Sequence, residues 1–253
     1  MSAILIFQFH APLASFGGVT SGLHRYSERI PARSMLLGML GAALGMDREN
    51  DRMFVQLQSE LQFAFRCISI GSDSSIMDFH TIQSLAGNLP ERTYTRRELL
   101  QQHKLICLPT YREYRCNEYW QVAITQRENG ISDAQLLPKL ETALKCPKYI
   151  LYAGRKSCPL GLPPDPQIYS CTLAEAFKKA EERIFDLMTL CCLGDEKERI
   201  PAALQKSKNI YWEGDPDISD VRVIKTIRVR DRIISRQRWQ FQEAELHVGE
   251  LLI

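Results

Sequence analysis

Hydrophobic residues follow two spacings along the chain, and each spacing predicts one kind of element. The apolar run Ala3–His10 is typical of a central strand covered on both faces. Leucines four residues apart predict a helix over Ala32–Leu44, which Gly45 ends. The same patterns predict a helix over Asp51–Ser59, strands over Leu61–Ile70 and Met77–Gln83, a hairpin over Thr110–Thr125 around Asn117, a helix over Ser132–Lys145 and a strand over Lys148–Ala153.

The order of these elements predicts the fold class. Without the short helix, it reads strand, helix, strand, strand, helix, strand, which is the ferredoxin-like order of RNA-recognition domains. The polar residues 84–104 indicate a protruding insertion, although a solvated hairpin or loop gives the same composition. We therefore expect an α+β chain with a ferredoxin-like domain at 1–163. A smaller β-rich region at 164–253 follows, with a helix over Leu173–Phe185, a polar linker, a strand over Asn209–Trp212 and basic strands.

Charge is close to balanced, so a nucleic-acid site has to come from local clusters of cations. Lysine and arginine number 32 against 30 acidic residues, which excludes a strong field around the whole protein. Within Val221–Ile233 the odd positions are mostly apolar, and a strand would present the intervening arginines on one face. Such a face is consistent with binding to an acidic partner or with simple exposure to solvent. Its members are Arg222, Arg228, Arg230 and Arg232.

Cysteine spacing and the terminal segment bear on metals and location. None of the eight cysteines forms a C-x-x-C pair, so we expect free thiols, no metal site and no cofactor. The N-terminal segment MSAILIFQFH lacks the basic flank of a signal peptide. No apolar run approaches the ~20 residues that cross a bilayer. These features predict a cytoplasmic protein.

The loop Gly154–Leu162, GRKSCPLGL, is the first candidate for binding chemistry. Its glycines permit a tight turn with exposed N–H groups, and Arg155 and Lys156 add positive charge beside the Ser157 hydroxyl. Such a loop suits a phosphate, although a solvated surface turn has the same composition. The sequence therefore predicts an anion site here and leaves the solvated turn open.

Two other segments carry similar signals. The long cationic loop Ala11–Pro31 leads into the predicted helix, whose first residues include Arg33 and Ser34. The dipole and free N–H groups of a helix start attract anions. Gly38 and Gly41 within that helix predict close packing against a sheet. In the expected hairpin, arginines alternate with tyrosines, a composition that stacks bases and holds phosphates but also makes an ordinary sheet face.

Five segments, taken in order, resemble a known family. They are HAPLASFGG, RIPARSMLLGMLGAALGM, DFHTIQ, TYREYRCNEYWQVAI and YAGRKSCPLGLP, with ISRQRWQF as a sixth similarity near the C-terminus. Together they resemble the CasD family of subunits of Cascade, the type I-E CRISPR surveillance complex. The resemblance implies a ferredoxin-like fold of the RAMP superfamily, with a thumb near Ser84–Lys104. It also implies a non-catalytic subunit that grips the 5′ handle of the crRNA and caps one end of the backbone filament.

The resemblance also implies partners and site residues. The partners are the crRNA 5′ handle, the CasC backbone subunit, the CasA large subunit and, through the assembled complex, target DNA. Because the handle has a fixed sequence, base contacts are expected beside phosphate contacts, and His80 is a candidate for them. The expected RNA-binding residues are Ser15, Arg25, Arg29, Arg33, Ser34, His80, Arg112, Arg155, Lys156 and Ser157.

Two other functions remain open from the sequence. The corresponding subunit of related type I-C systems cuts precursor RNA, so a metal-independent endoribonuclease is one alternative. It would need a base for the 2′-hydroxyl and a cation for the phosphate, and His24 or His80 together with Tyr111 or Lys156 are candidates for such roles. A scaffold that contacts only proteins is the other alternative, with its arginines paired to carboxylates of neighbouring subunits.

Overall fold

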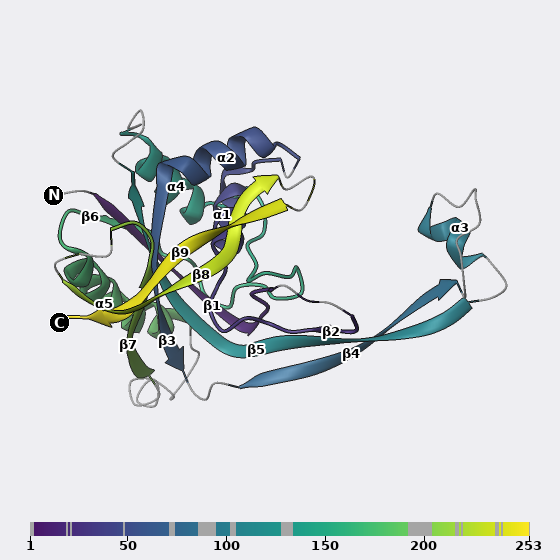
Figure 1. The fold of residues 1–253 in the computed structure, drawn as a ribbon. Coiled ribbons are helices and arrows are strands. Elements are labelled where there is room, and N and C mark those ends of the chain that lie inside the picture. Colours follow the sequence, from purple (N-terminus) through teal and green to yellow (C-terminus); the bar gives the residue numbers. More distant parts are fainter. Residues whose placement is uncertain are drawn as a thin grey trace.

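A nine-stranded sheet organises the protein, with helices on both faces and a long two-stranded arm that leaves the body (Figure 1). The computed structural model describes residues 3–18, 20, 22–47, 49–70, 74–85, 95–101, 105–127, 134–191, 204–215, 218, 220–235, 238 and 240–252. The main path of the sheet runs in the order β6-β1-β5-β3-β7-β9-β8, and β2 and β4 also pair with β5. All neighbours are antiparallel except β2 and β5.

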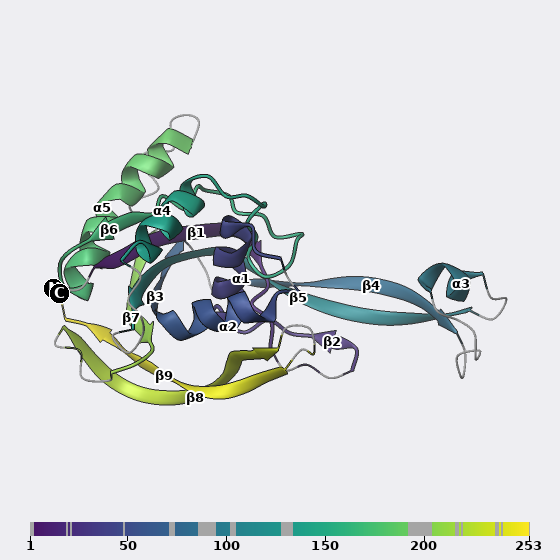
Figure 2. The same ribbon diagram turned by 90° about the horizontal axis from the view of Figure 1, so that it is seen from above.

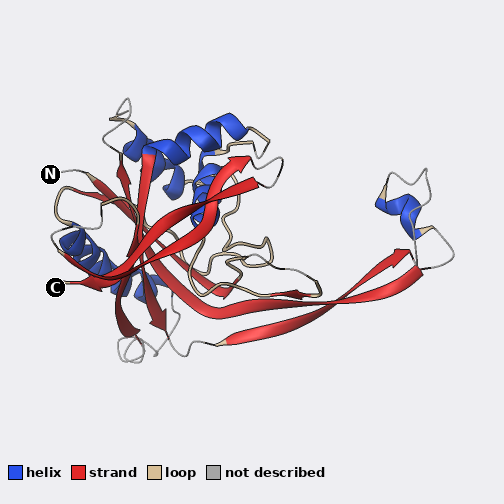
Figure 3. Cartoon of the chain, viewed as in Figure 1, coloured by secondary structure: helices blue, strands red, loops and turns tan. Residues whose placement is uncertain are grey.

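Figure 3 distinguishes the strands, in red, from the helices, in blue. The strands are β1 Ile4–Ala14, β2 His24–Arg25, β3 Leu61–Ile70, β4 Ser75–Leu85, β5 Leu105–Gln126, β6 Gln167–Tyr169, β7 Leu204–Trp212, β8 Val221–Ser235 and β9 Gln240–Leu251. The helices are α1 Arg33–Leu44, α2 Asp51–Glu60, α3 Arg96–Leu100, α4 Leu136–Lys145 and α5 Leu173–Cys191. No described helix is both long and apolar enough to cross a membrane.

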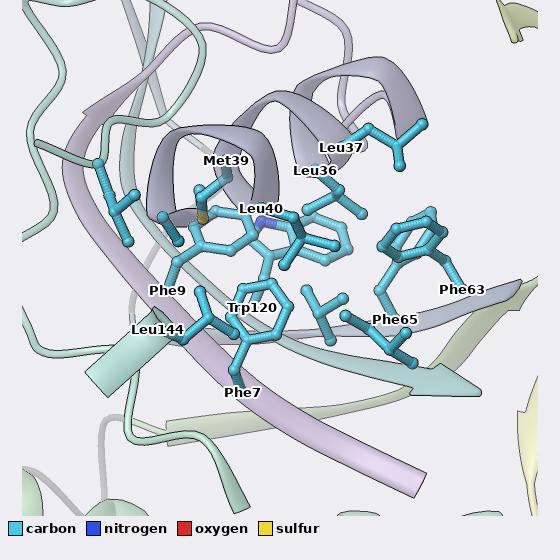
Figure 4. Close-up of a cluster of buried hydrophobic side chains, with 14 of the residues drawn as sticks. Phe7, Phe9, Leu36, Leu37, Met39, Leu40, Phe63, Phe65, Trp120 and Leu144 are labelled. Carbon is cyan, nitrogen blue, oxygen red and sulfur yellow. The ribbon is translucent and has the colours of Figure 1, made fainter. Parts of the chain in front are cut away.

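Both faces of the sheet are covered, as the apolar run of β1 predicts. Its odd positions, such as Phe7 and Phe9, join the larger cluster under α1, α2 and α4, whereas Ile4 and Ile6 face the smaller cluster under α5. Figure 4 shows the larger cluster, where leucines of α1 lie on aromatic side chains that include Trp120 of β5. Burying so many large apolar side chains fixes α1 against the sheet.

Most predicted elements are confirmed within a few residues, but two are wrong. The expected hairpin at Thr110–Thr125 is part of one continuous strand, β5, and Asn117 takes a positive φ of 52° without reversing the chain. Residues 148–153 form no strand beyond the isolated bridge between Tyr152 and Pro159. The place beside β1 is taken by β6 instead, because its three residues pair antiparallel with Ile4–Ile6.

The protruding segment is longer than the composition indicates. β4 pairs with the first half of β5 from Ser75 opposite Arg115 to Leu85 opposite Leu105. This pair, called the arm below, extends away from the body in both views and carries α3 at its far end (Figures 1 and 2). The expected insertion at 84–104 is only the tip, and residues 86–94 and 102–104 lie outside the described part.

The sheet also crosses the expected boundary at residue 163. β6 pairs with β1, and β7 pairs with β3, so strands from both sides share one hydrogen-bonded layer. Side chains extend the connection, because Gln58 of α2 donates to the Ile233 carbonyl and accepts from the Ile233 N–H. Asp51 likewise accepts from the Ser235 hydroxyl at 2.6 Å. The C-terminal ribbon of β8 and β9 is thereby fixed to α2.

Candidate nucleic-acid interface

A pocket of about 440 Å³ lies where the loop after β1, the start of α1 and the Gly154 turn meet. It brings together four of the ten expected RNA-binding residues, Ser15, Arg25, Ser34 and Arg155. These residues come from three segments, because Ser15 and Arg25 share the cationic loop, Ser34 belongs to α1 and Arg155 to the glycine turn. The cationic loop and the glycine loop that the sequence singled out separately therefore form one site.

The glycine turn is held directly against the loop after β1. The Ser15 N–H donates to the Ala153 carbonyl at 3.0 Å. Gly154 has a φ of 89°, and a Cβ at this position would overlap the Ser15 carbonyl oxygen. Only glycine combines that conformation with so close a backbone approach. The predicted role of Gly154 in shaping the turn is confirmed.

Arg155 is oriented toward the pocket by the base of the arm. Its guanidinium lies over the Tyr114 ring, 4.7 Å from the centroid, and its Nη1 donates to the Glu113 carbonyl at 3.2 Å. An arginine has five N–H donors, so these contacts orient the group and leave it capacity to bind an anion. Glu113 also accepts from the Ser27 N–H, which ties the cationic loop to the same strand.

Lys156 and Ser157 occupy the outer part of the turn. Both side chains are exposed, and neither lines the pocket. Beneath them Cys158 is buried and donates its N–H to the Arg155 carbonyl at 2.9 Å. Burial raises the pKa of the Cys158 thiol, so this cysteine packs as a neutral side chain. The two outer residues are thus positioned to extend the anion site rather than to form its floor.

Cations also meet where β2 pairs with β5. These strands run parallel, with Arg25 beside Arg112 and His24 beside Tyr111. Asp78 of β4 is the partner of Arg112 on the other side and contacts His80 at 2.6 Å from Oδ2 to Nε2. His80 therefore lies on the arm, away from the pocket lining. Arg29 is exposed in the loop between β2 and α1 and has interactions of its own.

Arg33 does not lie where the sequence places it. Only 1% of its side chain is exposed, and its Nε forms an ion pair with Glu213 at 2.7 Å. Its Nη2 donates to the carbonyls of Gln58 and Leu61, and its guanidinium lies 5.1 Å from the centroid of the Phe63 ring. Because these internal partners surround it, Arg33 joins α1 to β3 and β7 instead of facing a phosphate.

The start of α1 already has an anion. The Arg33 N–H donates to the Asp231 carboxylate of β8 at 2.8 Å, so the protein's own side chain fills the place expected for a phosphate. Burial raises the pKa of Asp231, while the hydrogen bond from Arg33 lowers it. Ser34, one residue further, lines the pocket. Of the two residues expected to bind an anion at the helix start, Arg33 and Ser34, only Ser34 lines the pocket.

The predicted arginine face of β8 is confirmed only in part, because register shifts between Val223 and Lys225 and between Arg230 and Arg232 interrupt the alternation, and Arg232 lies near Glu213 with only 20% of its side chain exposed. Arg222, Arg228 and Arg230 are exposed, and their partners on β9 are Glu250, Glu245 and Glu243. Opposite charges directly across a strand pair attract each other. These three glutamates account for the local balance of charge on this strand pair. This face is therefore a weaker candidate for a polyanion than the pocket.

Sequence reasoning missed Tyr26 and misread the role of Gly41. Tyr26 lines the pocket and is 57% exposed, and its position between two arginines in the cationic loop is the signal that could have found it. A Cβ on Gly41 would lie 2.5 Å from a ring carbon of Phe54, so this glycine lets α1 approach α2 rather than the sheet. In the described part of the chain, no group of three or more His, Cys, Asp or Glu side chains could hold a metal ion.

Comparisons with known proteins agree with this architecture. The model of the family "CRISPR-associated protein (Cas_Cas5)" matches residues 4–247. The curated relative "CRISPR system Cascade subunit CasD" of Escherichia coli (strain K12) is 32% identical over 169 residues, which cover 64% of this chain and 70% of the relative.

Solved structures show the same fold over nearly the whole chain. A chain of a "CRISPR RNA-guided surveillance complex" has a TM-score of 0.56 at 19% identity, covering 98% of this chain and 90% of its own. A "Crystal structure of Cas protein" has a TM-score of 0.55 at 22% identity, with coverages of 98% and 94%. Because the family model spans almost every described element, the chain belongs to the CRISPR-associated Cas5 family.

Proposed function

We propose that this chain is a non-catalytic, crRNA-binding subunit of a type I-E CRISPR surveillance complex. In this role it grips the 5′ handle of the guide RNA and caps one end of the backbone filament, so that the complex recognises invading DNA. Family membership and the 32% identity to a Cascade subunit support the assignment. The proposed partners are the CasC backbone subunit and the CasA large subunit, with target DNA reached through the assembled complex in the cytoplasm.

The pocket is the observation that carries the RNA-binding role. It places the guanidinium of Arg155, the Arg25 side chain and the Ser34 hydroxyl around one concave surface. Lys156 and Ser157 extend that surface along the turn, and Arg112 lies beside Arg25 on the neighbouring strand. Spaced cations with hydroxyl donors suit successive phosphates of a single strand. Arg29 and His80 remain proposed contacts outside the pocket, whereas Arg33 is no longer part of the proposed set.

The fold fits the same assignment. The order β6-β1-β5-β3 is antiparallel throughout, and α1 and α4 pack on one face of it. We interpret these elements as the ferredoxin-like domain of the RAMP superfamily, with β6 extending the expected 1–163 by a few residues. The arm is the proposed thumb. The remaining C-terminal strands would then form an extension that shares the sheet.

A binding experiment with a paired substitution tests this function. The full-length protein is titrated with a fluorescent RNA that carries the repeat-derived 5′ handle, and anisotropy reports affinity. We expect the Arg155→Ala and Lys156→Ala double variant to bind more weakly, because it loses two cations of the glycine turn. The matched control replaces Lys178 and Lys179, exposed neighbours on α5 at the opposite face of the sheet. If both double variants bind the RNA with equal affinity, the glycine turn is not part of the RNA site.

The endoribonuclease alternative rests on one contact. His80 is held by the Asp78 carboxylate, an arrangement that orients a histidine for base catalysis. Incubation of the protein with repeat RNA in a chelator separates the two functions. The non-catalytic proposal predicts intact RNA. A discrete product that is made by the wild type and lost in His80→Ala would establish the nuclease instead.

A further inference from the structure

Four aromatic side chains, three of them exposed and Tyr111 partly buried, form a column along the inner half of the arm. The Tyr26 and His24 rings are stacked, with centroids 5.7 Å apart and planes at 11°. His24 and Tyr111 are stacked more closely, at 4.7 Å and 8°. Phe79 continues the row at 5.4 Å from Tyr111 with a tilt of 55°. The strands β2, β4 and β5 and the loop after β2 therefore bring their rings into one row.

Strand register explains why the rings meet. Phe79 of β4, Tyr111 of β5 and His24 of β2 are in-register partners, so their side chains share one face. Tyr26 follows His24 by two residues and closes the row at the pocket. The column is not part of the hydrophobic core, because Tyr26 and Phe79 are each 57% exposed. A row of large, ordered, exposed rings is typical of a binding surface.

The charged side chains beside the rings indicate which kind of ligand the column binds. Arg25 lies between His24 and Tyr26 in the chain, and Arg112 follows Tyr111. The two arginines are partners across β2 and β5 and alternate with His24 and Tyr111, so they point to the opposite face of the strand pair from those rings. Asp78 of β4 is the other partner of Arg112, which leaves a net positive charge here, and Arg25 lines the pocket together with Tyr26. A polyanion is attracted to this charge, and planar bases attached to it match the planar rings. Single-stranded RNA has both features.

We propose that this column is a stacking platform for unpaired nucleobases, and that a base on the open face of Tyr26 continues the ring stack. His24 covers one face of the Tyr26 ring, and the rest of the side chain is exposed beside the pocket. A nucleotide whose phosphate contacts Arg25 places its base within reach of that face. This inference rests on the proposed RNA-binding function and adds the part of the site that recognises bases.

The test separates base stacking from phosphate binding. Full-length protein is titrated with the handle RNA and with a series of the same RNA, each carrying one abasic ribose. At one position the abasic change is expected to weaken wild-type binding roughly 5- to 100-fold, the equivalent of ~1–3 kcal/mol for one stacked base. The Tyr26→Leu variant is expected to bind the intact RNA more weakly by the same factor. In this variant, the abasic change at the same position is expected to have no further effect.

Control variants and a spectroscopic signal complete the test. Tyr26→Phe keeps the ring and is expected to bind as the wild type does. Tyr149→Leu changes a tyrosine of similar exposure, 53%, that does not line the pocket, and is expected to have no effect. A 2-aminopurine base at the sensitive position is expected to be quenched by wild type and Tyr26→Phe, and not by Tyr26→Leu.

The outcomes that overturn the inference are distinct from failure of the proposed function. If Tyr26→Leu binds every RNA as the wild type does, the platform is wrong while RNA binding stands. The same follows if Tyr26→Leu weakens intact and abasic RNAs equally. Unchanged RNA binding with loss of assembly into a surveillance complex would assign the column to a protein partner and also overturn the inference. If the wild type binds none of the RNAs, the proposed function itself fails.

Discussion

Arg33 and Glu213 form a buried ion pair, with Nε and Oε1 2.7 Å apart and side chains only 1% and 4% exposed. The two residues are 180 positions apart in the chain. The pair connects the start of α1 to the end of β7, and Asp231 adds a second link from β8 to the same helix start. Since α1 also lines the pocket, this network fixes one wall of the proposed RNA site.

We expect Arg33→Ala to destabilise the fold by roughly 3–5 kcal/mol, because it leaves the Glu213 carboxylate buried without its partner. Urea unfolding of the wild type, each single variant and the double variant with Glu213→Ala measures the coupling. The double variant is expected to recover part of the loss. If Arg33→Ala kept full stability but lost RNA affinity, Arg33 would belong to the RNA site after all.

His10 predicts a pH dependence of stability. Burial lowers the pKa of His10, its Nδ1 is buried and has no hydrogen-bond partner among the described residues, and its ring packs edge-on against Tyr119. The folded protein thus binds a proton less readily than the unfolded chain, whose histidines have a pKa of about 6.5. This contribution to stability is present above pH 6.5 and is lost as the pH falls through that value.

NMR titration of His10 is expected to give a pKa below 6.5, and the free energy of unfolding is expected to fall as the pH decreases from about 6.5 toward that folded-state pKa. His10→Phe removes the titrating group, so its stability should depend less steeply on pH across this range. A variant with the same pH dependence as the wild type would show that other groups cause it.

Gly154→Ala is expected to disturb both stability and RNA binding. Alanine at a φ of 89° is strained, and its Cβ overlaps the Ser15 carbonyl oxygen, so the turn has to move away from the loop after β1. Gly22→Ala is the matched control, since Gly22 also has a positive φ, 77°, does not line the pocket, and a Cβ there meets no described atom within 4 Å.

The control is expected to lose about 1–2 kcal/mol from backbone strain alone. Thermal or urea unfolding of the two variants gives the comparison, with anisotropy for the handle RNA. Equal losses in both variants would mean that contact between Gly154 and Ser15 does not shape the pocket.

Local patterns predicted local structure well. The leucine spacing of α1 gives its bounds within one residue, since the pattern of side chains and the helix repeat coincide. The strand β3 was placed at its observed bounds because Phe63 and Phe65 alternate with smaller residues. β5 was split in error because Asn117, a frequent turn residue, interrupts an aromatic run; here the residue takes a positive φ inside a continuous strand.

Long-range pairing explains the other differences. Arg33 was expected in the RNA site because its partners, Glu213 and Asp231, lie far along the chain and no local pattern shows them. The arginine face of β8 was identified only in part, because both the register shifts that interrupt it and its glutamate partners depend on the pairing with β9. The pocket was predicted in pieces for the same reason, since only the folded chain brings Ser15 to Gly154.

The salt dependence of RNA binding tests the central claim most directly. The affinity for the handle RNA is measured from low to high salt for the wild type, for Arg25→Ala with Arg155→Ala, and for Arg228→Ala with Arg230→Ala as the control. Each phosphate contact contributes roughly 0.7 to the slope of log affinity against log salt for a single strand. We predict that the pocket variant loses about 1.4 from the slope and that the control, whose arginines face Glu245 and Glu243, keeps it. If the slope falls only in the control variant, the RNA binds at β8 rather than in the pocket, which contradicts the account.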